Sequence, residues 1–261
     1  MTPPCIALLT DFGTRDWYAA AMRGVILSYC PSARILDITH EVPPQDIVAG
    51  ALTLAAAAPW FPRGTVFAAV VDPGVGGDRA LVAARADGRY FVGPDNGLLA
   101  LALAKAERVA LIRLTNRRYW RRSVSQTFHG RDIMAPVAAH LANGVPLARL
   151  GVALKRLTPL EMPVPQRHGR TVRGQILHID TFGNLITNLP AALLVRRDAA
   201  AHASLRYQRH AVRMVSSYAA GRPQELIAIV NSQELIELAI REGSAAWTFN
   251  AKRGDAVELI P

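Results

Sequence analysis

Residues 66 to 79 read VFAAVVDPGVGGDR, and the rest of the chain is arranged around this stretch. It begins with an apolar run, Val66 to Val71, whose length and β-branched content predict a buried strand. Asp72 stands at the end of that strand, and a turn rich in Gly separates it from Arg79. Sites in α/β sheets form at the carboxyl ends of strands, so this pair is a candidate for chemistry. A plain β-turn with a surface Asp–Arg pair is the alternative, and the stretch alone does not decide between them.

Length and composition limit the class of protein. The chain has 261 residues, enough for one large or two ordinary domains, and 51% of them are hydrophobic, which argues against disorder. We expect no signal peptide, and the Ala/Leu-rich runs are too short to span a bilayer. The two cysteines, Cys5 and Cys30, form neither a disulfide framework nor a metal motif, so we expect a cytoplasmic protein.

The formal net charge of +10 favours an anionic partner such as nucleic acid. The densest basic cluster is NRRYWRR, residues 116–122, in which Tyr119 and Trp120 separate two pairs of arginines. Alternating aromatic and arginine side chains can stack on bases. No nucleic-acid-binding motif accompanies this cluster, so we favour a solvated arginine-rich turn and do not expect a nucleic-acid partner.

Strands and helices alternate through the first part of the chain. The apolar patterns predict strands over 6–9, 34–38, 66–71, 80–86, 90–92 and 109–114, and helices over 16–29, 45–57, 98–106 and 133–143. This alternation predicts an α/β domain, residues 1–158, with a mostly parallel sheet and flanking helices.

The pattern changes after a Pro-rich linker over residues 159–170. Six short apolar runs then predict strands over 172–179, 185–188, 210–215, 226–230, 246–249 and 256–260, with one helix over 190–196. A second, smaller domain over 171–261 is therefore predicted to be a β-barrel or a sandwich.

Acidic residues and a histidine follow strands of the first domain: Asp11, Asp72, Asp95, His129 and Asp132. Loops at one edge of a sheet can converge, so these side chains can form one site. Two kinds of chemistry are open to such a site. Carboxylates and a histidine can hold divalent ions for metal-assisted hydrolysis, but no HxH, DxD or HExxH spacing occurs. Alternatively, Arg79 favours hydroxide over water while Asp72 or His129 accepts the proton or orients the nucleophile. We favour the metal-free interpretation, although an isolated histidine before a helix is more often structural.

The stretch HIDTFGNL, residues 178–185, ends a strand of the second domain with a carboxylate, an aromatic ring and an amide. Phe182 offers a ring face to a heterocycle, and Asp180 and Asn184 offer hydrogen bonds. An Asx-type hairpin turn explains the same residues and stays open as the alternative.

Six blocks of the chain, taken together, resemble the S-adenosyl-L-methionine hydroxide adenosyltransferase family, which is related to the fluorinase and chlorinase enzymes. They are LLTDFGTRDWY, VVDPGVGGDR, FVGPDNGLLA, TFHGRDIMAPVAAHLANG, HIDTFGNLITN and NSQELIELA. The resemblance runs from about Ile6 to the C-terminus. It implies hydrolysis of S-adenosyl-L-methionine to adenosine and L-methionine without a cofactor or metal. It also implies an α/β domain followed by a β-barrel, in a homotrimer whose sites lie between neighbouring subunits.

The same resemblance assigns roles to individual residues. It implies the catalytic set Asp72, Arg79 and His129, which the halogenating relatives lack. Substrate contacts are implied for Asp11, Asp180, Phe182, Asn184 and Ser232. One departure is Glu234, where the family usually has glycine, so the contacts near Ser232 are the least secure. We hypothesise that Arg79 and His129 hold and deprotonate the water while Asp72 orients them, and the sequence leaves open which of Asp72 and His129 takes the proton.

Overall fold

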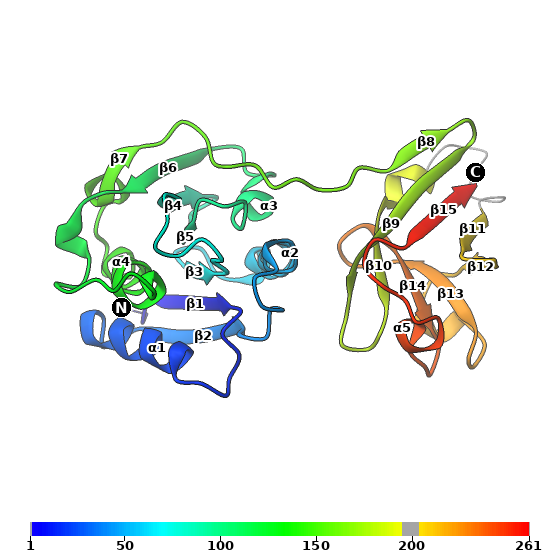
Figure 1. The fold of residues 1–261 in the computed structure, drawn as a ribbon, viewed down its shortest axis with the longest axis horizontal. Helices are drawn as coiled ribbons and strands as arrows, with labels where there is room; N and C mark the ends of the chain where they lie inside the picture. Colours follow the sequence, from blue (N-terminus) through cyan, green and yellow to red (C-terminus); the bar gives the residue numbers. More distant parts are fainter. Residues whose placement is uncertain (1, 195–203, 261) are drawn as a thin grey trace. The chain divides into compact units, whose positions relative to one another are not determined.

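A computed structural model describes residues 2–194 and 204–260. The chain divides into two compact units, an N-terminal one that ends at Glu161 and a C-terminal one that begins at Met162. Figure 1 shows a layered α/β arrangement in the first unit and a β-barrel in the second. No helix in the described parts of the chain is long and apolar enough to cross a membrane.

The N-terminal unit alternates strands and helices as the apolar patterns predicted. Its main elements are β1 (Cys5–Thr10), α1 (Tyr18–Tyr29), β2 (Arg34–Thr39), α2 (Ile47–Ala57), β3 (Val66–Val70), β4 (Leu81–Ala86), β5 (Arg89–Pro94), α3 (Ala100–Leu103), β6 (Val109–Leu114), α4 (Ala135–Ala142) and β7 (Gly151–Ala153). Short 3-10 helices occupy Ala58–Trp60, Arg117–Tyr119 and Leu147–Leu150, and a π-helical segment, η3 (Gly130–Met134), precedes α4.

These strands form one sheet in the order β2-β1-β3-β5-β4-β6-β7. The pairs β1–β2, β1–β3 and β3–β5 are parallel, whereas the pairs β4–β5, β4–β6 and β6–β7 are antiparallel. A tight turn at Asp87 and Gly88, both of which have positive φ, joins β4 to β5, and a two-residue hairpin can join only antiparallel strands. Because half of the strand pairs are antiparallel, the sheet is mixed and not mostly parallel as expected.

Helices cover both faces of this sheet. Side chains alternate between the faces, so Ile6 and Leu8 pack in the core under α1 and α4, whereas Ala7 and Leu9 pack in the core under α2 and α3. The run 66–71 is buried on both faces for the same reason, which explains its unbroken apolar sequence. The predicted start of α2 is confirmed, since the Asp46 side chain accepts a hydrogen bond from the backbone nitrogen of Ala49 at 2.9 Å.

The C-terminal unit is a closed barrel. Its strands are β8 (Gln166–His168), β9 (Thr171–Ile179), β10 (Leu185–Pro190), β11 (Ser204–Tyr207), β12 (His210–Met214), β13 (Leu226–Val230), β14 (Leu235–Ile240) and β15 (Ala256–Ile260), with a short helix α5 (Ala245–Thr248) and 3-10 helices at Ala191–Leu194 and Tyr218–Ala220. Their order is β10-β14-β13-β12-β11-β15-β9-β8, and a further pairing of β10 with β9 closes the barrel. The predicted fold class is therefore confirmed, with a barrel rather than a sandwich.

Several predicted elements of this unit differ from the structure. The strand predicted over 246–249 is the helix α5, because Ser244 caps its start by accepting a hydrogen bond from the backbone nitrogen of Trp247 at 3.1 Å. The helix predicted over 190–196 is a 3-10 helix over Ala191–Leu194, and residues 195–196 lie outside the described chain. Strands β11 and β14 were not predicted, and β8 lies in the predicted linker.

Candidate functional site

The loop after β3 carries Asp72 and Arg79 toward a second loop that is distant in sequence. Two successive turns fold it, with hydrogen bonds from the Val75 nitrogen to the Asp72 oxygen and from the Gly77 nitrogen to the Gly74 oxygen. Gly76, inside the second turn, has φ +82°, and a Cβ atom there would lie 2.5 Å from the Gln126 carbonyl oxygen. Glycine therefore permits the close approach of these two loops.

Asp72, Arg79 and His129 meet through hydrogen bonds. The Arg79 guanidinium donates to the Asp72 carboxylate from Nε at 2.9 and 3.0 Å and from Nη2 at 2.5 Å. The same Nη2 lies 2.9 Å from Nδ1 of His129, which is 50 residues further along the chain. The Asp72 side chain is 4% exposed and that of Arg79 is 11% exposed, so this ion pair is largely shielded from water.

The contact with Arg79 determines the protonation of His129. A guanidinium can only donate, so Nδ1 must accept, and the neutral imidazole carries its proton on Nε2. Burial lowers the pKa of His129, and the positive charge of Arg79 lowers it further. The histidine is also the residue before the π-helical segment η3, an irregular helix start of the kind that recurs at functional sites.

A pocket of about 430 Å³ lies in front of Asp72 and His129, and Asp11 lines it too. Asp11 follows β1, the strand beside β3, as expected for a site at the carboxyl edge of the sheet. Its Oδ2 accepts a hydrogen bond from the backbone nitrogen of Gln45 at 2.8 Å, and burial raises its pKa. Asp11, Asp72 and His129 thus line one pocket, and Arg79 bonds to the last two of them, as the sequence indicated for this domain.

Aromatic residues form another wall of this pocket, and sequence reasoning did not assign them a role. Phe12, Tyr18 and Phe128 line it, with ring centroids 5.3 to 5.7 Å apart. The sequence does indicate these three aromatic residues, because they lie near Asp11 and His129 in the blocks LLTDFGTRDWY and TFHGRD. An apolar wall opposite charged groups suits a ligand with both an aromatic and a polar part.

Two acidic residues considered for the same edge do not line this pocket. Asp95 accepts a hydrogen bond from the backbone nitrogen of Thr158 at 2.7 Å. Asp132 is buried and forms ion pairs with Arg121 and Arg131 at 2.9 and 2.7 Å, which lower its pKa despite its burial. Both are therefore structural. Within the described ranges, no group of three or more His, Cys, Asp or Glu side chains is placed to hold a metal ion.

In the C-terminal unit, the residues after β9 form an Asx-type turn. Asp180 Oδ1 accepts hydrogen bonds from the backbone nitrogens of Phe182 and Asn184 at 2.9 and 2.8 Å, and Oδ2 accepts from Asn184 Nδ2 at 2.9 Å. This turn buries Asn184 but leaves the Phe182 ring 78% exposed. The Asx-type turn is therefore present at Asp180, and it holds Phe182 outward.

Ser232 and Glu234 lie in the tight turn between β13 and β14, where the Glu234 nitrogen donates to the Asn231 oxygen at 3.0 Å. Ser232 is exposed. Glu234 has φ +60°, a left-handed conformation that glycine adopts more easily than other residues. The turn therefore keeps the backbone shape that a glycine would give, although this chain has a glutamate.

Comparisons with known proteins agree with the resemblance read from the sequence. Two family models match: the SAM hydroxide adenosyltransferase N-terminal domain over residues 6–151 and the C-terminal domain over residues 174–258. A relative from Salinispora tropica named (R)-S-adenosyl-L-methionine hydrolase is 40% identical, over 98% of this chain and 97% of its own. A fluorinase from Actinoplanes sp. is 30% identical, over 98% of this chain and 97% of its own. The crystal structure of an uncharacterized conserved protein from Thermotoga maritima superposes with a TM-score of 0.90 at 34% identity, covering 98% of this chain and all of that one.

Proposed function

The chain belongs to the S-adenosyl-L-methionine hydroxide adenosyltransferase family, and from that membership we propose that it hydrolyses S-adenosyl-L-methionine to adenosine and L-methionine. Relatives that bear the name of this hydrolase match nearly the whole chain. The observation that carries the proposal is the hydrogen-bonded set of Asp72, Arg79 and His129, two of which line a pocket with Asp11 and three aromatic residues.

In the proposed step, a water oxygen attacks C5′ of the ribose. The new bond is C5′–O, the bond that breaks is C5′–S, and its electron pair goes to sulfur, which leaves as the neutral thioether of methionine. The positive charge of the sulfonium disappears as the bond breaks, so no negative charge develops on the substrate and no Lewis acid is needed to stabilise one. The reaction requires an aligned and partly desolvated nucleophile, at roughly 3–3.5 Å from the carbon.

The hydrogen bonds favour Asp72 as the group that accepts the proton of the water. Nδ1 of His129 is already engaged by Arg79, and Nε2 carries the ring proton, so the neutral imidazole is placed to donate. Carboxylate oxygens can accept more than one hydrogen bond, so Asp72 keeps acceptor capacity beside Arg79. We therefore assign orientation of the water to His129, fixed positive charge to Arg79 and proton acceptance to Asp72.

Substrate contacts follow from the same pocket. Asp11 has one oxygen held by Gln45 and a second that can accept hydrogen bonds from the ribose hydroxyl groups. Exposed Phe182 is proposed to stack on the adenine, and Asn184 and Ser232 to contact the substrate beside it, while Asp180 acts by holding their turn.

We further infer a homotrimer in which the C-terminal unit of a neighbouring subunit completes each site. An aromatic side chain as exposed as Phe182 is a candidate for contact with a partner or ligand. A molar mass of three chains in light scattering supports this inference, whereas a fully active monomer would contradict it. We place the protein in the cytoplasm, because Cys5 and Cys30 are both free thiols.

The test of the proposed activity is incubation of the purified chain with S-adenosyl-L-methionine in ¹⁸O-labelled water. We expect equal amounts of adenosine and methionine, with one ¹⁸O atom in the 5′-hydroxyl of adenosine. Addition of EDTA is expected to leave the rate unchanged. Loss of activity with EDTA and recovery with Mn²⁺ would instead indicate a metal-dependent hydrolase, and a 5′-chloro product in the presence of chloride would indicate a halogenating enzyme.

A further inference from the structure

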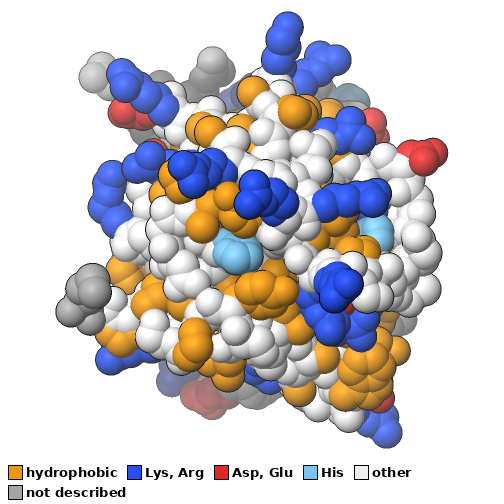
Figure 2. Space-filling view, turned by 90° about the vertical axis from the view of Figure 1, so that its left-hand side faces the viewer, with side chains coloured by type: hydrophobic (Ala, Val, Ile, Leu, Met, Phe, Trp, Pro, Cys, Tyr) orange, Lys and Arg blue, Asp and Glu red, His pale blue; other side chains and the backbone are white. Residues whose placement is uncertain are grey.

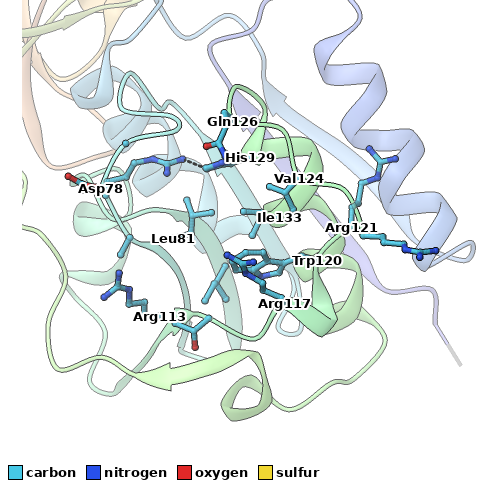
Figure 3. A pocket seen from close by; sticks show the side chains of 16 residues that line it. Asp78, Leu81, Arg113, Arg117, Trp120, Arg121, Val124, Gln126, His129 and Ile133 are labelled. Carbon is cyan, nitrogen blue, oxygen red and sulfur yellow. Dashed lines mark hydrogen bonds between the residues drawn. The ribbon is translucent and has the colours of Figure 1, made fainter.

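A second pocket of about 760 Å³ lies on the other side of Arg79 and His129, shown in Figure 3. Its lining includes only one acidic residue, Asp78, and five arginines: Arg79, Arg113, Arg117, Arg121 and Arg122. Three of these arginines come from the cluster NRRYWRR, which the proposed hydrolysis does not use. Figure 2 shows one face of the molecule, on which Lys and Arg side chains stand among neutral and apolar ones. Figure 3 shows that Arg113, Arg117 and Arg121 come from different parts of the pocket lining.

The positive charge of this pocket is only partly balanced by the protein. Arg79 is paired with Asp72, and Arg121 is paired with Asp132. Arg113, Arg117 and Arg122 form no ion pair with any acidic side chain in the described parts of the chain. Guanidinium groups that line one concave site without counter-charges create a positive potential that attracts anions.

A second, independent observation concerns Trp120, which also lines this pocket. Its indole Nε1 is buried and has no hydrogen-bond partner, one of only two such side-chain atoms in the described residues. An indole nitrogen can only donate, and a buried donor without an acceptor is destabilising. A ligand in the pocket would place acceptor oxygens beside the unpaired guanidinium groups, and it would reach the indole nitrogen, which is closed to solvent, only if the lining shifts.

We propose that this pocket binds a small molecule that bears two or more phosphate groups. Guanidinium groups form bidentate, charge-assisted hydrogen bonds with phosphate oxygens, and several phosphates are needed to reach arginines that come from β6 and from the loop after it. The volume is in the range of small-molecule sites. Single-stranded nucleic acid is less suited, because Trp120 packs against the core and Arg117 lies over its ring at 5.6 Å, so the ring is already engaged.

The test is calorimetric titration of the full chain with inorganic pyrophosphate at constant ionic strength. We expect a dissociation constant of about 1 mM or tighter, and weaker binding of single phosphate ions. Replacing both Arg113 and Arg117 by alanine should weaken binding at least about tenfold, because each loses a charge-assisted hydrogen bond. Trp120→Phe keeps a benzene ring but removes the five-membered ring with its N–H group, and it should weaken binding several-fold while thermal unfolding shows that the variant is folded. Arg34→Ala, an exposed arginine on the edge strand β2, is the matched control and should bind as the unmodified chain does.

The proposal does not depend on the proposed hydrolysis, since binding is measured without S-adenosyl-L-methionine. Thermal unfolding of each variant shows whether it is folded, and Arg113 and Arg117 are exposed side chains whose removal should not disturb the core. No binding of pyrophosphate by the folded chain would overturn the proposal. So would equal losses in Arg34→Ala and in the double variant, or tight binding of a single-stranded oligonucleotide without binding of pyrophosphate.

Discussion

Asp72 and Asp180 both follow a strand, β3 and β9, yet their carboxylates have different partners. Asp180 accepts hydrogen bonds only from its own turn, within four residues, so its position is determined locally. Asp72 is held by Arg79, which in turn contacts His129 from a loop 50 residues away. A carboxylate that bonds only within its own turn fixes the shape of a loop. A carboxylate bonded to a cation that also contacts a distant loop instead helps to build a site with charges and proton-transfer capacity.

The largest expected effect comes from removing the cation that holds Asp72 and His129. Arg79→Ala should lower kcat by at least about 10²-fold, because it removes both the positive charge and the donor to His129. The measurement is steady-state formation of adenosine. Arg34→Ala is the control for loss of one arginine. Wild-type turnover in Arg79→Ala would remove this residue from the mechanism and end the contrast between the two aspartates.

The pH profile tests the protonation of His129. Burial and Arg79 lower its pKa below the ordinary 6.5, so activity should stay high at pH 6.5 and then fall about tenfold per pH unit once the pH is below that lowered pKa. Between the lowered pKa of the folded chain and the ordinary 6.5 of the unfolded chain, His129 binds more protons in the unfolded chain than in the folded one. The contribution of His129 to the free energy of unfolding is therefore complete above pH 6.5 and is lost as the pH falls through the lowered pKa.

His140→Asn is the matched control for this profile, because burial also lowers the pKa of His140 but this residue lines neither pocket described above. Its variant should keep the acid limb of the activity profile. An acid limb at or above pH 6.5 in the unmodified chain would contradict the assigned role of His129.

Asp180→Ala tests the local side of the comparison. It removes three hydrogen bonds within the turn after β9, so we expect the free energy of unfolding to fall by about 1–3 kcal/mol. The Michaelis constant should rise because Phe182 and Asn184 lose their support, while kcat changes little. Chemical denaturation and steady-state kinetics measure the two effects. A fall in kcat as large as that of Arg79→Ala would show that the two aspartates do not differ as proposed.

Phe182→Ala separates binding from stability. The ring is 78% exposed, so the free energy of unfolding should change by no more than about 0.5 kcal/mol. Loss of stacking should raise the Michaelis constant up to about tenfold. Trp60→Ala, at an 84% exposed aromatic residue of the N-terminal unit, should change neither quantity. An unchanged Michaelis constant in Phe182→Ala would argue against its contact with substrate.

The smallest effect is expected at Glu234. Glycine tolerates its φ of +60° better than glutamate, so Glu234→Gly should raise the free energy of unfolding, by less than about 1 kcal/mol. Glu234→Ala removes the same charge but keeps the Cβ atom, and it should give no increase. A loss of stability in Glu234→Gly would show that the side chain itself supports the turn.

Local patterns predicted most of the fold. The buried run 66–71, the strands expected over 80–86 and 90–92 and the helix expected over 45–57 all have counterparts in the structure at nearly the same residues. The wrong predictions in the barrel arise where a short stretch of sequence fits more than one kind of secondary structure. The run 246–249 is apolar and short, so it suits a strand or a helix equally well, and the cap at Ser244 decides in favour of a helix.

Local sequence was enough to locate strand ends, turns and the polar residues that follow each strand, because these depend on side chains within a few residues of one another. The sequence also determined the family, since six separated blocks agree. The packed fold was needed to show that Arg79 bonds to both Asp72 and His129. It was also needed to show that Asp95 and Asp132 bond to groups outside the pocket of Asp72, and that three arginines of NRRYWRR line one pocket with Trp120. Those contacts join residues from separate loops, and their geometry exists only once the sheet and its helices have packed.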